Sequence, residues 1–456
     1  MSRNFTMNKD CYRVIFSKVR GIMVVVSELT KSQGKKSSAD TQFKSSSNPS
    51  ATPETSLKRL IVALLYCQSM VYSQALAATT QIQNTASNIP SSQRAALLKA
   101  PNGTPIVNIR TPNSKGLSHN TYNQFDIGSN GAVLNNSTRD AKTQLAGTIS
   151  GNQYLGKGAA NTILNEIRSN KISQLNGTIE VAGQQADIII ANPSGLQIQG
   201  GGFINVNRAT LTTGTPKIDT SGNLTGLDVK QGQVQFNNAQ AGFALGGPAQ
   251  KQANYVDVLA RAINVNGKIQ ANESVTMISG SNSVDYDTLA ATEISGTGTK
   301  PTLAVDVSNL GGVYANSIQL IGTEAGLGVK NAGVIQAGQQ IRLTNTGKIE
   351  NSGTIATTKK QTSLIDLEAA GLTGSINHTG SLNSYGMINL QADKDIAINA
   401  GTIKKSNVSE DSNLLPNTIN LAAKQDITIE NKASIQNGSP STDSNIYIYL
   451  QEEILK

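Results

Sequence analysis

Short stretches rich in Ile, Val and Leu, many of them alternating with polar residues, fill the chain from about Thr178 onward. Examples are TIEVAG (178–183), ADIIIAN (186–192), LQIQG (196–200) and FINVN (203–207). Alternation with a period of two residues predicts β-strands that turn one face inward. No long stretch has the period of an amphipathic helix, and residues 161–168 could form a short helix or a strand. The pattern therefore predicts an all-β protein built from short strands.

A small unit, Asn-x-Gly-x-Ile, recurs in the second half of the chain. It occupies residues 331–335, 345–349, 351–355 and 399–403. Comparable units lie roughly 20 residues apart, which is typical of a solenoid. Short strands with Gly or Asn at corners that require positive φ predict a parallel β-helix, in which each coil stacks on the previous one. A β-sandwich of short strands is the alternative, although hairpins need no such repeat.

The first 77 residues have a different composition from the rest. Residues 60–71, LIVALLYCQSMV, are mostly apolar, follow Lys58 and Arg59, and precede the small residues of Ala75-Leu76-Ala77. This order predicts a secretory signal that is cleaved between Ala77 and Ala78. The apolar run is too short to span a bilayer of roughly 30 Å. A buried N-terminal core helix is the alternative, and no membrane-spanning segment is expected after cleavage.

Charge and cysteine content separate the leader from the remainder. Residues 1–77 contain 11 Lys and Arg against 4 Asp and Glu, whereas the remaining residues contain 27 against 26. A nucleic-acid-binding protein needs a basic surface on its folded part, which this balance argues against. Both cysteines, Cys11 and Cys67, precede the predicted cleavage site. The mature chain therefore has no thiol for disulfides, metal binding or catalysis.

Residues 7–28, MNKDCYRVIFSKVRGIMVVVSE, form a second basic and apolar block ahead of the signal. This block resembles the extended signal peptide region of very large exported bacterial proteins, and the resemblance suggests that Met7 rather than Met1 is the first residue. We therefore divide the leader into an extension (7–28), a linker (29–57) and the signal proper (58–77).

A second resemblance covers most of the mature chain. Residues 116–137, GLSHNTYNQFDIGSNGAVLNNS, and residues 145–214 closely resemble the secretion domain of filamentous haemagglutinin and of contact-dependent inhibition proteins. The resemblance implies a right-handed parallel β-helix with an N-terminal capping secretion domain. It also implies a secretion domain at 78–315, followed at 316–456 by the first repeats of a β-helical filament.

The same resemblance implies a partner and candidate recognition residues. The family is exported by two-partner secretion, through an outer-membrane β-barrel transporter with periplasmic domains. Its Asn-Pro-x-Gly turn falls on Asn192, Pro193, Ser194 and Gly195, where Pro fixes φ and Gly allows a left-handed conformation. A role in folding alone is the alternative for this turn.

A second family turn, Asn-Pro-Asn-Leu, aligns with residues 152–155, so that Asn152 and Leu155 match. Gln153 replaces the family proline and removes the fixed φ. We therefore expect less partner recognition at this second turn than at the first.

Residues that could carry chemistry are sparse. The two histidines, His119 and His378, are far apart in sequence, and we expect each at the surface or in a turn. Asp285 and Asp287 could bind a cation, but solvated loop carboxylates are the simpler interpretation. We therefore expect no catalytic residues, no metal, no cofactor and no enzymatic activity.

The sequence thus predicts a secreted or cell-surface, adhesin-like filamentous exoprotein that passes through the periplasm. Its further partner would be a receptor on a host or neighbouring cell. Two alternatives remain: the N-terminal stem of a contact-dependent growth inhibition toxin, and a β-helical polysaccharide lyase. The absence of Trp argues against the lyase, because such enzymes often stack sugars on aromatic rings.

Overall fold

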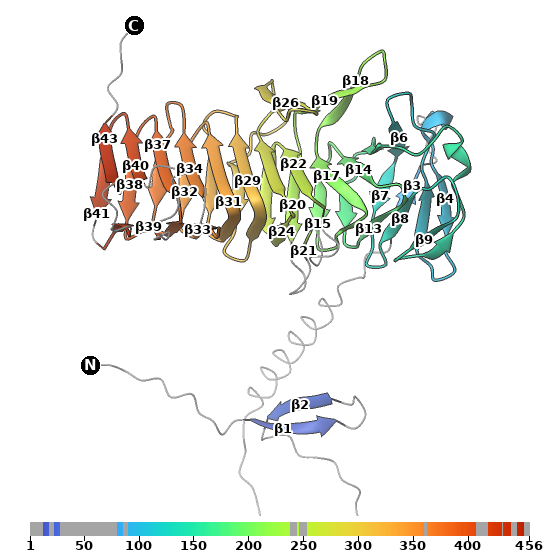
Figure 1. Ribbon diagram of the computed structural model, residues 1–456, viewed down its shortest axis with the longest axis horizontal. Coiled ribbons are helices and arrows are strands. Elements are labelled where there is room, and N and C mark those ends of the chain that lie inside the picture. The colour runs from blue at the N-terminus through green and yellow to red at the C-terminus, as the bar shows by residue number, and fades with distance from the viewer. Residues whose placement is uncertain are drawn as a thin grey trace, which may run out of the picture. The chain divides into compact units, whose positions relative to one another are not determined.

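The structure is a computed structural model of the 456-residue chain. It describes residues 80–84, 90–237, 253–359, 363–406, 418–430, 432–438 and 445–450, and strand segments at 12–17, 22–27 and 244–245. The chain forms two compact units, Met1–Gln74 and Ala75–Lys456. In the first unit, β1 (Tyr12–Ser17) and β2 (Ile22–Ser27) form an antiparallel hairpin (Figure 1).

The predicted signal, and its cleavage site between Ala77 and Ala78, lie outside the described residues. Within the described part of the chain, no helix has the length and apolar character needed to span a membrane.

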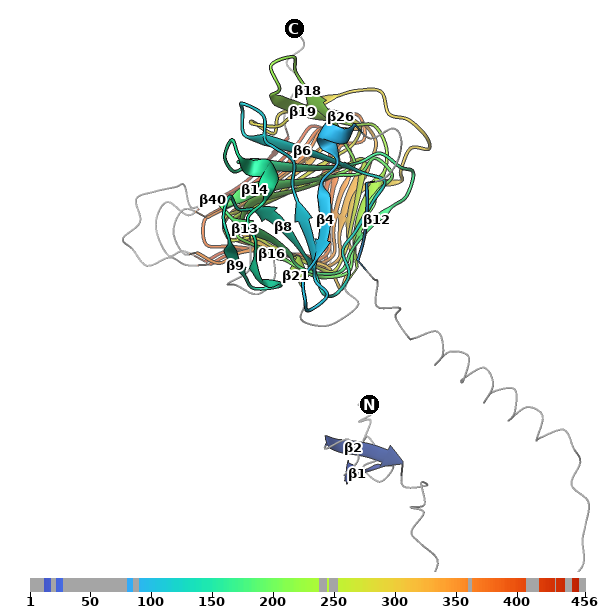
Figure 2. The ribbon, with the colours of Figure 1, turned by 90° about the vertical axis from the view of Figure 1, so that its right-hand side faces the viewer.

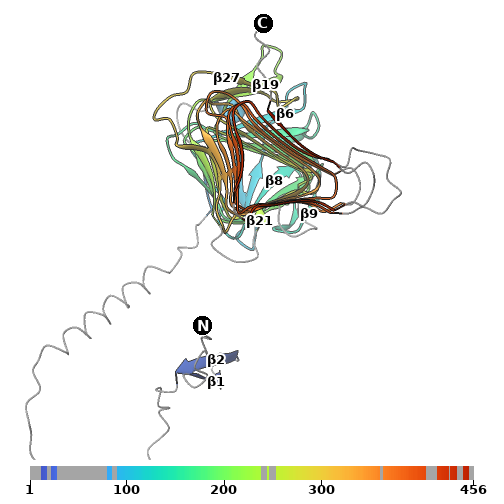
Figure 3. The ribbon, with the colours of Figure 1, turned by 90° about the vertical axis from the view of Figure 1, so that its left-hand side faces the viewer.

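The second unit is a parallel β-helix, as predicted (Figure 1). Seen along its axis, the coils superimpose as a three-sided outline, and we name the three sheets face A, face B and face C (Figure 3). Each complete coil passes through face C, then face B, then face A. Coil-to-coil pairing is parallel throughout these sheets, because every strand returns to the same face one coil later.

Face C is a ten-stranded sheet. Its strands, in order, are β12 (Ser173–Leu175), β15 (Leu196–Ile198), β20 (Gln233–Asn237), β23 (Ala262–Asn266), β28 (Leu303–Val307), β30 (Gly328–Asn331), β32 (Ile349–Asn351), β35 (Ile376–His378), β38 (Ile396–Asn399) and β41 (Ile427–Glu430).

Face B begins at the N-terminal end with β5 (Pro105–Asn108), β8 (Ala132–Asn136), β13 (Ile179–Gly183) and β16 (Phe203–Ile204). It continues with β21 (Ala244–Leu245), β24 (Lys268–Gln270), the first parts of β29 (Gly312–Gly322) and β31 (Val334–Asn345), β33 (Thr354–Thr357), β36 (Ser381–Ser384), β39 (Thr402–Lys405) and β42 (Ser434–Asn437).

Face A contains the longer strands. They are β6 (Leu117–Tyr122), β11 (Thr162–Ile167), β14 (Ala186–Ala191), β17 (Val206–Thr212), β22 (Tyr255–Ala260), β25 (Ser274–Ser279), the second parts of β29 and β31, β34 (Leu364–Ala369), β37 (Met387–Ala392), β40 (Thr418–Ala423) and β43 (Asn445–Leu450). The segment that could have been helix or strand is therefore strand β11.

The core fills the inside of the coils with stacked aliphatic side chains. Ile318, Ile341, Ile365 and Ile388 are register neighbours on face A, and each is completely buried. Neighbouring members of this stack lie 23 or 24 residues apart, slightly more than the predicted period of roughly 20. Burying one such side chain contributes about 1.5–3 kcal/mol, so the stack stabilises every coil in a similar way.

A four-stranded antiparallel sheet covers the outer side of face A in the N-terminal half of the β-helix. It consists of β18 (Thr215–Ile218), β19 (Leu224–Val229), β26 (Asn282–Asp285) and β27 (Ala291–Glu293), and we name it the cover sheet. Leu227 and Val284 of this sheet pack in one cluster with Ile189 of face A. Strand β14 is consequently buried on both sides from Ile188 to Ala191, which explains the apolar run at these four positions.

The N-terminal end of the β-helix is closed by antiparallel elements (Figure 2). Strand β3 (Gln81–Gln83) pairs with β7 (Gln124–Asp126), and β4 (Ala96–Lys99) pairs with β5. The hairpin of β9 (Ala141–Thr143) and β10 (Gly147–Ile149) lies beside β13. The short 3₁₀ helices η1 (Ser91–Gln93) and η2 (Gln153–Leu155) complete this end. Such elements pair strand edges that would otherwise be open to other chains.

The glycines of the Asn-x-Gly-x-Ile units correct one expectation. Gly333 and Gly353 do not have positive φ, contrary to the predicted reason for glycine at these corners. A Cβ on Gly353 would instead lie 2.1 Å from the carbonyl oxygen of Gly333 in the preceding coil, and one on Gly333 would lie 2.3 Å from that of Gly311. Glycine is required there because successive coils approach closely.

Asn331 and Asn351 of the same units point inward and bond from coil to coil. The Nδ2 of Asn331 donates to the Oδ1 of Asn351 over 2.7 Å, and the Nδ2 of Asn351 lies 3.0 Å from the Nδ1 of His378. His378 lies in β35 and is only 1% exposed, so its predicted position at the surface or in a turn is wrong. It extends an internal polar ladder that no single stretch of sequence reveals.

Candidate partner-recognition site

The turn at residues 192–195 joins β14 on face A to β15 on face C. The Oδ1 of Asn192 accepts a hydrogen bond from the Ser194 amide over 3.0 Å, and its carbonyl accepts one from the Gly195 amide over 2.9 Å. The first bond forms an Asx turn, as the sequence predicted, and the second closes a β-turn. Gly195 has φ +120°, and a Cβ there would lie 3.0 Å from the carbonyl oxygen of Gln233.

Asn192 is built into the corner rather than displayed on it. Its side chain is completely buried, and Nδ2 donates to the Lys171 carbonyl and to the Ser173 hydroxyl, each over 2.9 Å. Gly195 is buried as well, whereas Pro193 and Ser194 are half-buried. In the folded chain, a partner could therefore contact only the middle two residues of the turn.

A groove of about 550 Å³ lies beside this turn. Pro193 and Ser194 line one part of it, and Ile172, whose side chain is 44% exposed, lines another. The residues at 297–299 and Pro301 also line it. The groove thus combines apolar surface with the turn, which is a suitable surface for a peptide segment.

A buried ion pair is bonded to the Thr297 segment of this lining. Arg261 contacts Glu324 through two bonds, Nε to Oε2 over 3.0 Å and Nη2 to Oε1 over 2.8 Å, and its Nη1 donates to the Thr297 carbonyl over 2.6 Å. The hydrogen bonds from Arg261 keep the pKa of Glu324 below its ordinary value. The sequence analysis missed this pair; an arginine directly after the apolar run YVDVLA was the available signal.

The second candidate turn is also structural in the folded chain. Asn152 caps η2, its Oδ1 accepting from the Tyr154 amide, and its Nδ2 donates to the carbonyls of Ile109 over 2.8 Å and Asn135 over 2.9 Å. Both Asn152 and Leu155 are nearly completely buried. No hydrogen bond within the described residues joins this turn to the one at 192–195, so the two candidates form separate corners.

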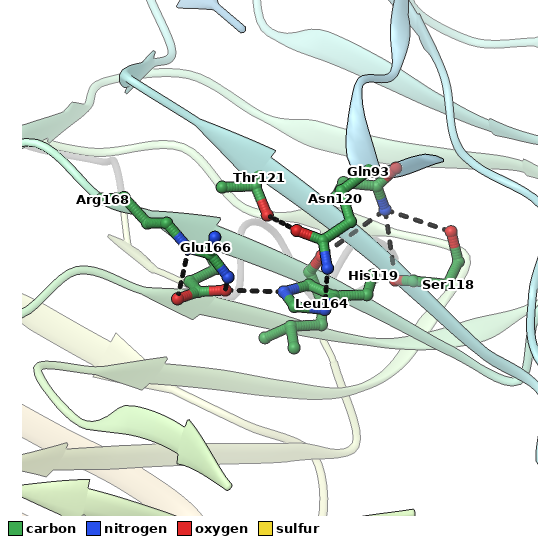
Figure 4. A network of polar contacts seen from close by, with 8 residues as sticks. All are labelled: Gln93, Ser118, His119, Asn120, Thr121, Leu164, Glu166 and Arg168. Carbon is green, nitrogen blue, oxygen red and sulfur yellow. Dashed lines mark hydrogen bonds and ion pairs between the residues drawn. The ribbon is translucent and has the colours of Figure 1, made fainter. Parts of the chain in front are cut away.

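His119 belongs to a polar network on the outer side of β6 and β11 (Figure 4). Its Nε2 lies 2.6 Å from Glu166 Oε2, and Arg168 Nε donates to the other carboxylate oxygen over 2.9 Å. Burial alone would raise the pKa of Glu166, but the bonds from His119 and Arg168 outweigh it and lower that pKa. Gln93 of η1 contacts His119 Nδ1 over 3.2 Å, so the network ties the N-terminal cap to the first coils.

The two aspartates weighed as possible cation ligands are Asp285, the last residue of β26, and Asp287, in the turn that follows it. Asp285 and Asp287 are exposed, and Asp285 accepts hydrogen bonds from the amide and hydroxyl of Thr288. Across the described ranges, no three His, Cys, Asp or Glu side chains gather closely enough to hold a metal ion.

The parallel β-helix and its closed N-terminal end define a class, the β-helical secretion domain of exported bacterial proteins. Residues 80–356 match the TPS secretion domain family, and residues 7–53 match the Extended Signal Peptide of Type V secretion system. The chain belongs to the TPS secretion domain family, and it is a two-partner-secreted exoprotein that passes through the periplasm.

Similar proteins support this family assignment. The chain is 39% identical over 357 residues to "Toxin CdiA" of Yersinia pestis, covering 78% of this chain, and 39% identical over 350 residues to "tRNA nuclease CdiA-2" of Burkholderia pseudomallei, covering 76%. It spans only 10% and 11% of these two relatives. The crystal structure of the filamentous hemagglutinin secretion domain has the same fold, with a TM-score of 0.56, 24% identity, and coverage of 82% of this chain and all of that one.

Proposed function

We propose that this chain is the export module and first filament coils of an adhesin-like surface exoprotein. Its partner would be an outer-membrane β-barrel transporter with periplasmic domains, and the turn at 192–195 would be the main recognition element. The observation that carries the proposal is the conjunction of a secretion-domain match at 80–356 with an Asn-Pro-x-Gly turn at a coil corner.

Burial of the turn in the folded chain bears on the stage of export at which the transporter binds it. Once the coils are stacked, Asn192 is completely buried and Asn152 is only 3% exposed, whereas in an unfolded chain both side chains are accessible. We therefore propose that the transporter binds these segments before the coils form, and that the same side chains then stabilise the folded corner outside the cell. Stacking of each coil on the last would favour movement outward.

A stem for a contact-dependent toxin is the second candidate. It is favoured by the CdiA relatives, whose printed names include toxin and tRNA nuclease, but a toxic activity would need residues beyond the matched tenth of those proteins. We propose no enzymatic activity and no cofactor for the chain itself. The exposed positions of Asp285 and Asp287, and the lack of three gathered metal-ligating side chains among the described residues, are the observations behind this proposal.

Binding of the chain to the isolated periplasmic domains of the transporter tests the proposal. We expect urea-unfolded chain, diluted into buffer, to bind these domains and folded chain to bind at least tenfold more weakly. Asn192→Ala should weaken binding of the unfolded chain. Asn351→Ala is the matched control, because it also removes a buried corner asparagine but lies outside the turn. Unchanged binding of unfolded Asn192→Ala would assign Asn192 to folding alone, and equal losses from both variants would show that the effect is not specific to the turn.

A further inference from the structure

The turn that joins β26 to β27 covers part of face A, and we name its residues 285–290 the cover turn. Tyr286 of this turn is 9% exposed and belongs to the same apolar cluster as Ile189. Leu289 packs against that cluster with φ +58°, a conformation that a leucine rarely adopts. Because this backbone is strained, packing on face A rather than the turn itself keeps the cover turn closed.

A buried aspartate lies in the part of face A that the cover sheet covers. Asp257 is 1% exposed and belongs to the outward row of face A that contains Ile189. Its Oδ2 accepts a hydrogen bond from the Thr210 hydroxyl over 3.4 Å and lies 3.4 Å from Arg208 Nε. Both contacts are long, and among the described residues no hydrogen bond joins Asp257 to Tyr286. A carboxylate buried in this way is stable mainly in its neutral form.

The charges around Asp257 compensate its ionisation only in part. Burial raises the pKa of Asp257 to about 6, and the charges and bonds of Arg208 and Thr210 do not restore the ordinary value. A second carboxylate, Asp187, raises this pKa further, and its Oδ1 accepts a hydrogen bond from the Arg208 amide over 3.1 Å. Arg208 thus lies beside two carboxylates rather than one.

The cover turn has titratable groups of its own, and two of them keep one charge state near neutral pH. Burial, together with the nearby carboxylates, raises the pKa of Tyr286, so its hydroxyl stays protonated. Hydrogen bonds from Thr288 lower the pKa of Asp285, so this carboxylate stays ionised. Asp287 is exposed and points away from no partner that would bury it. Asp257 is therefore the group whose charge changes beneath the closed turn.

We propose that Asp257 and the cover turn form a pH-sensitive latch, closed while Asp257 is neutral and opened when it ionises. Ionisation requires water at the carboxylate, and water reaches it when Tyr286 and Leu289 leave face A. Opening would release the strained backbone of Leu289 and uncover the apolar surface around Ile189. The latch is independent of the turn at 192–195 and goes beyond the export role.

Hydrogen exchange of the purified chain, followed by mass spectrometry of peptides that cover residues 282–291, tests the proposal. Exchange rates are corrected for the intrinsic effect of pH, so that they report the population of the open turn. With a pKa of about 6 in the closed state and an ordinary value in the open state, opening should increase about tenfold from pH 5.0 to pH 7.5. Asp257→Asn should remove this increase, because the amide is neutral at both pH values.

Asp366→Asn is the matched control, since Asp366 is a half-buried aspartate of the same outward row but lies outside the cluster under the cover sheet. It should keep the tenfold increase. Arg208→Gln should move the increase to higher pH, because it removes the cation that favours ionised Asp257. Circular dichroism accompanies each variant, and Arg208→Gln decides if Asp257→Asn does not fold.

Three results would overturn the latch. The first is equal corrected exchange of the cover turn at pH 5.0 and pH 7.5 in the native chain. The second is an increase that persists in folded Asp257→Asn. The third is the same increase in peptides from residues 387–398, which carry no cover, because opening would then be global rather than local to the turn.

Discussion

Individual side chains of the internal ladder make the folded state sensitive to pH. His378 donates from Nε2 to the Thr402 carbonyl over 3.1 Å, which leaves Nδ1 as the acceptor facing Asn351. This arrangement requires a neutral ring. Burial lowers the pKa of His378, and the bonds to Thr402 and Asn351 offset only part of that effect.

The sign of the effect follows from this lowered pKa. Because the unfolded chain binds a proton on His378 more readily than the folded chain, stability is complete above the ordinary pKa of about 6.5 and decreases as the pH falls below it. We expect the titration of His378 to lower the urea midpoint at pH 5.0 relative to pH 7.5. His378→Asn keeps an amide in the ladder and removes the titrating ring, so it should reduce this difference.

Asp257 acts in the opposite direction and must be separated from His378. Burial raises the pKa of Asp257 to about 6 despite Arg208 nearby, so its contribution to stability is complete below the ordinary pKa of about 4 and is lost as the pH rises through 6. Comparing the native chain with His378→Asn cancels this shared contribution. An unchanged pH dependence in His378→Asn would contradict the role assigned to the ring.

At the scale of single elements, the corners require glycine because successive coils approach closely there. A Cβ on Gly353 would overlap the Gly333 carbonyl, so Gly353→Ala should reduce the free energy of unfolding by about 1–3 kcal/mol, as overpacking does elsewhere. Gly156→Ala is the matched control, because nothing lies within 4 Å of its added Cβ and its φ is −59°. Chemical denaturation measures both, and equal effects would contradict the close-contact explanation.

The cover sheet makes a second prediction at this scale. Ile189 and Gln319 belong to the same outward row of face A, but Ile189 is buried beneath the cover sheet and Gln319 is exposed. Ile189→Ala should therefore cost about 2–5 kcal/mol of stability, whereas Gln319→Ala should cost less than about 0.5 kcal/mol. Thermal unfolding compares the two, and a small loss at Ile189 would show that the cover sheet contributes little packing.

Sequence reasoning succeeded where a feature repeats and failed where it depends on neighbouring coils. Alternation and the Asn-x-Gly-x-Ile unit predicted the parallel β-helix, because stacked coils must repeat the same inward positions. The buried state of His378, the cover sheet over Ile189 and the pair of Arg261 with Glu324 join residues from different coils or from an insertion. Asn351 and His378 are 27 residues apart, and Arg261 and Glu324 are 63 residues apart, so local sequence patterns cannot show these contacts.

At the scale of the whole molecule, passage as an unfolded chain should forbid loops closed by covalent bonds. Residues 78–456 contain no cysteine, so this part of the chain cannot form a disulfide in an oxidising periplasm. Gln319 and Arg342 are register neighbours on face A and 23 residues apart. We expect the double variant Gln319→Cys, Arg342→Cys to be exported poorly and to recover with a reducing agent. Each single variant serves as a control, and normal export of the disulfide-closed chain would contradict threading.

The dependence of export on one outer-membrane transporter tests the central claim most directly. Cells that express this chain with and without a two-partner secretion transporter are separated into medium, surface, periplasm and cytosol, and the processed chain is quantified in each fraction. We predict processed chain in the medium or on the surface only when the transporter is present, and in the periplasm when it is absent. Equal amounts outside the cell in both cases, or processed chain in the cytosol, would contradict it.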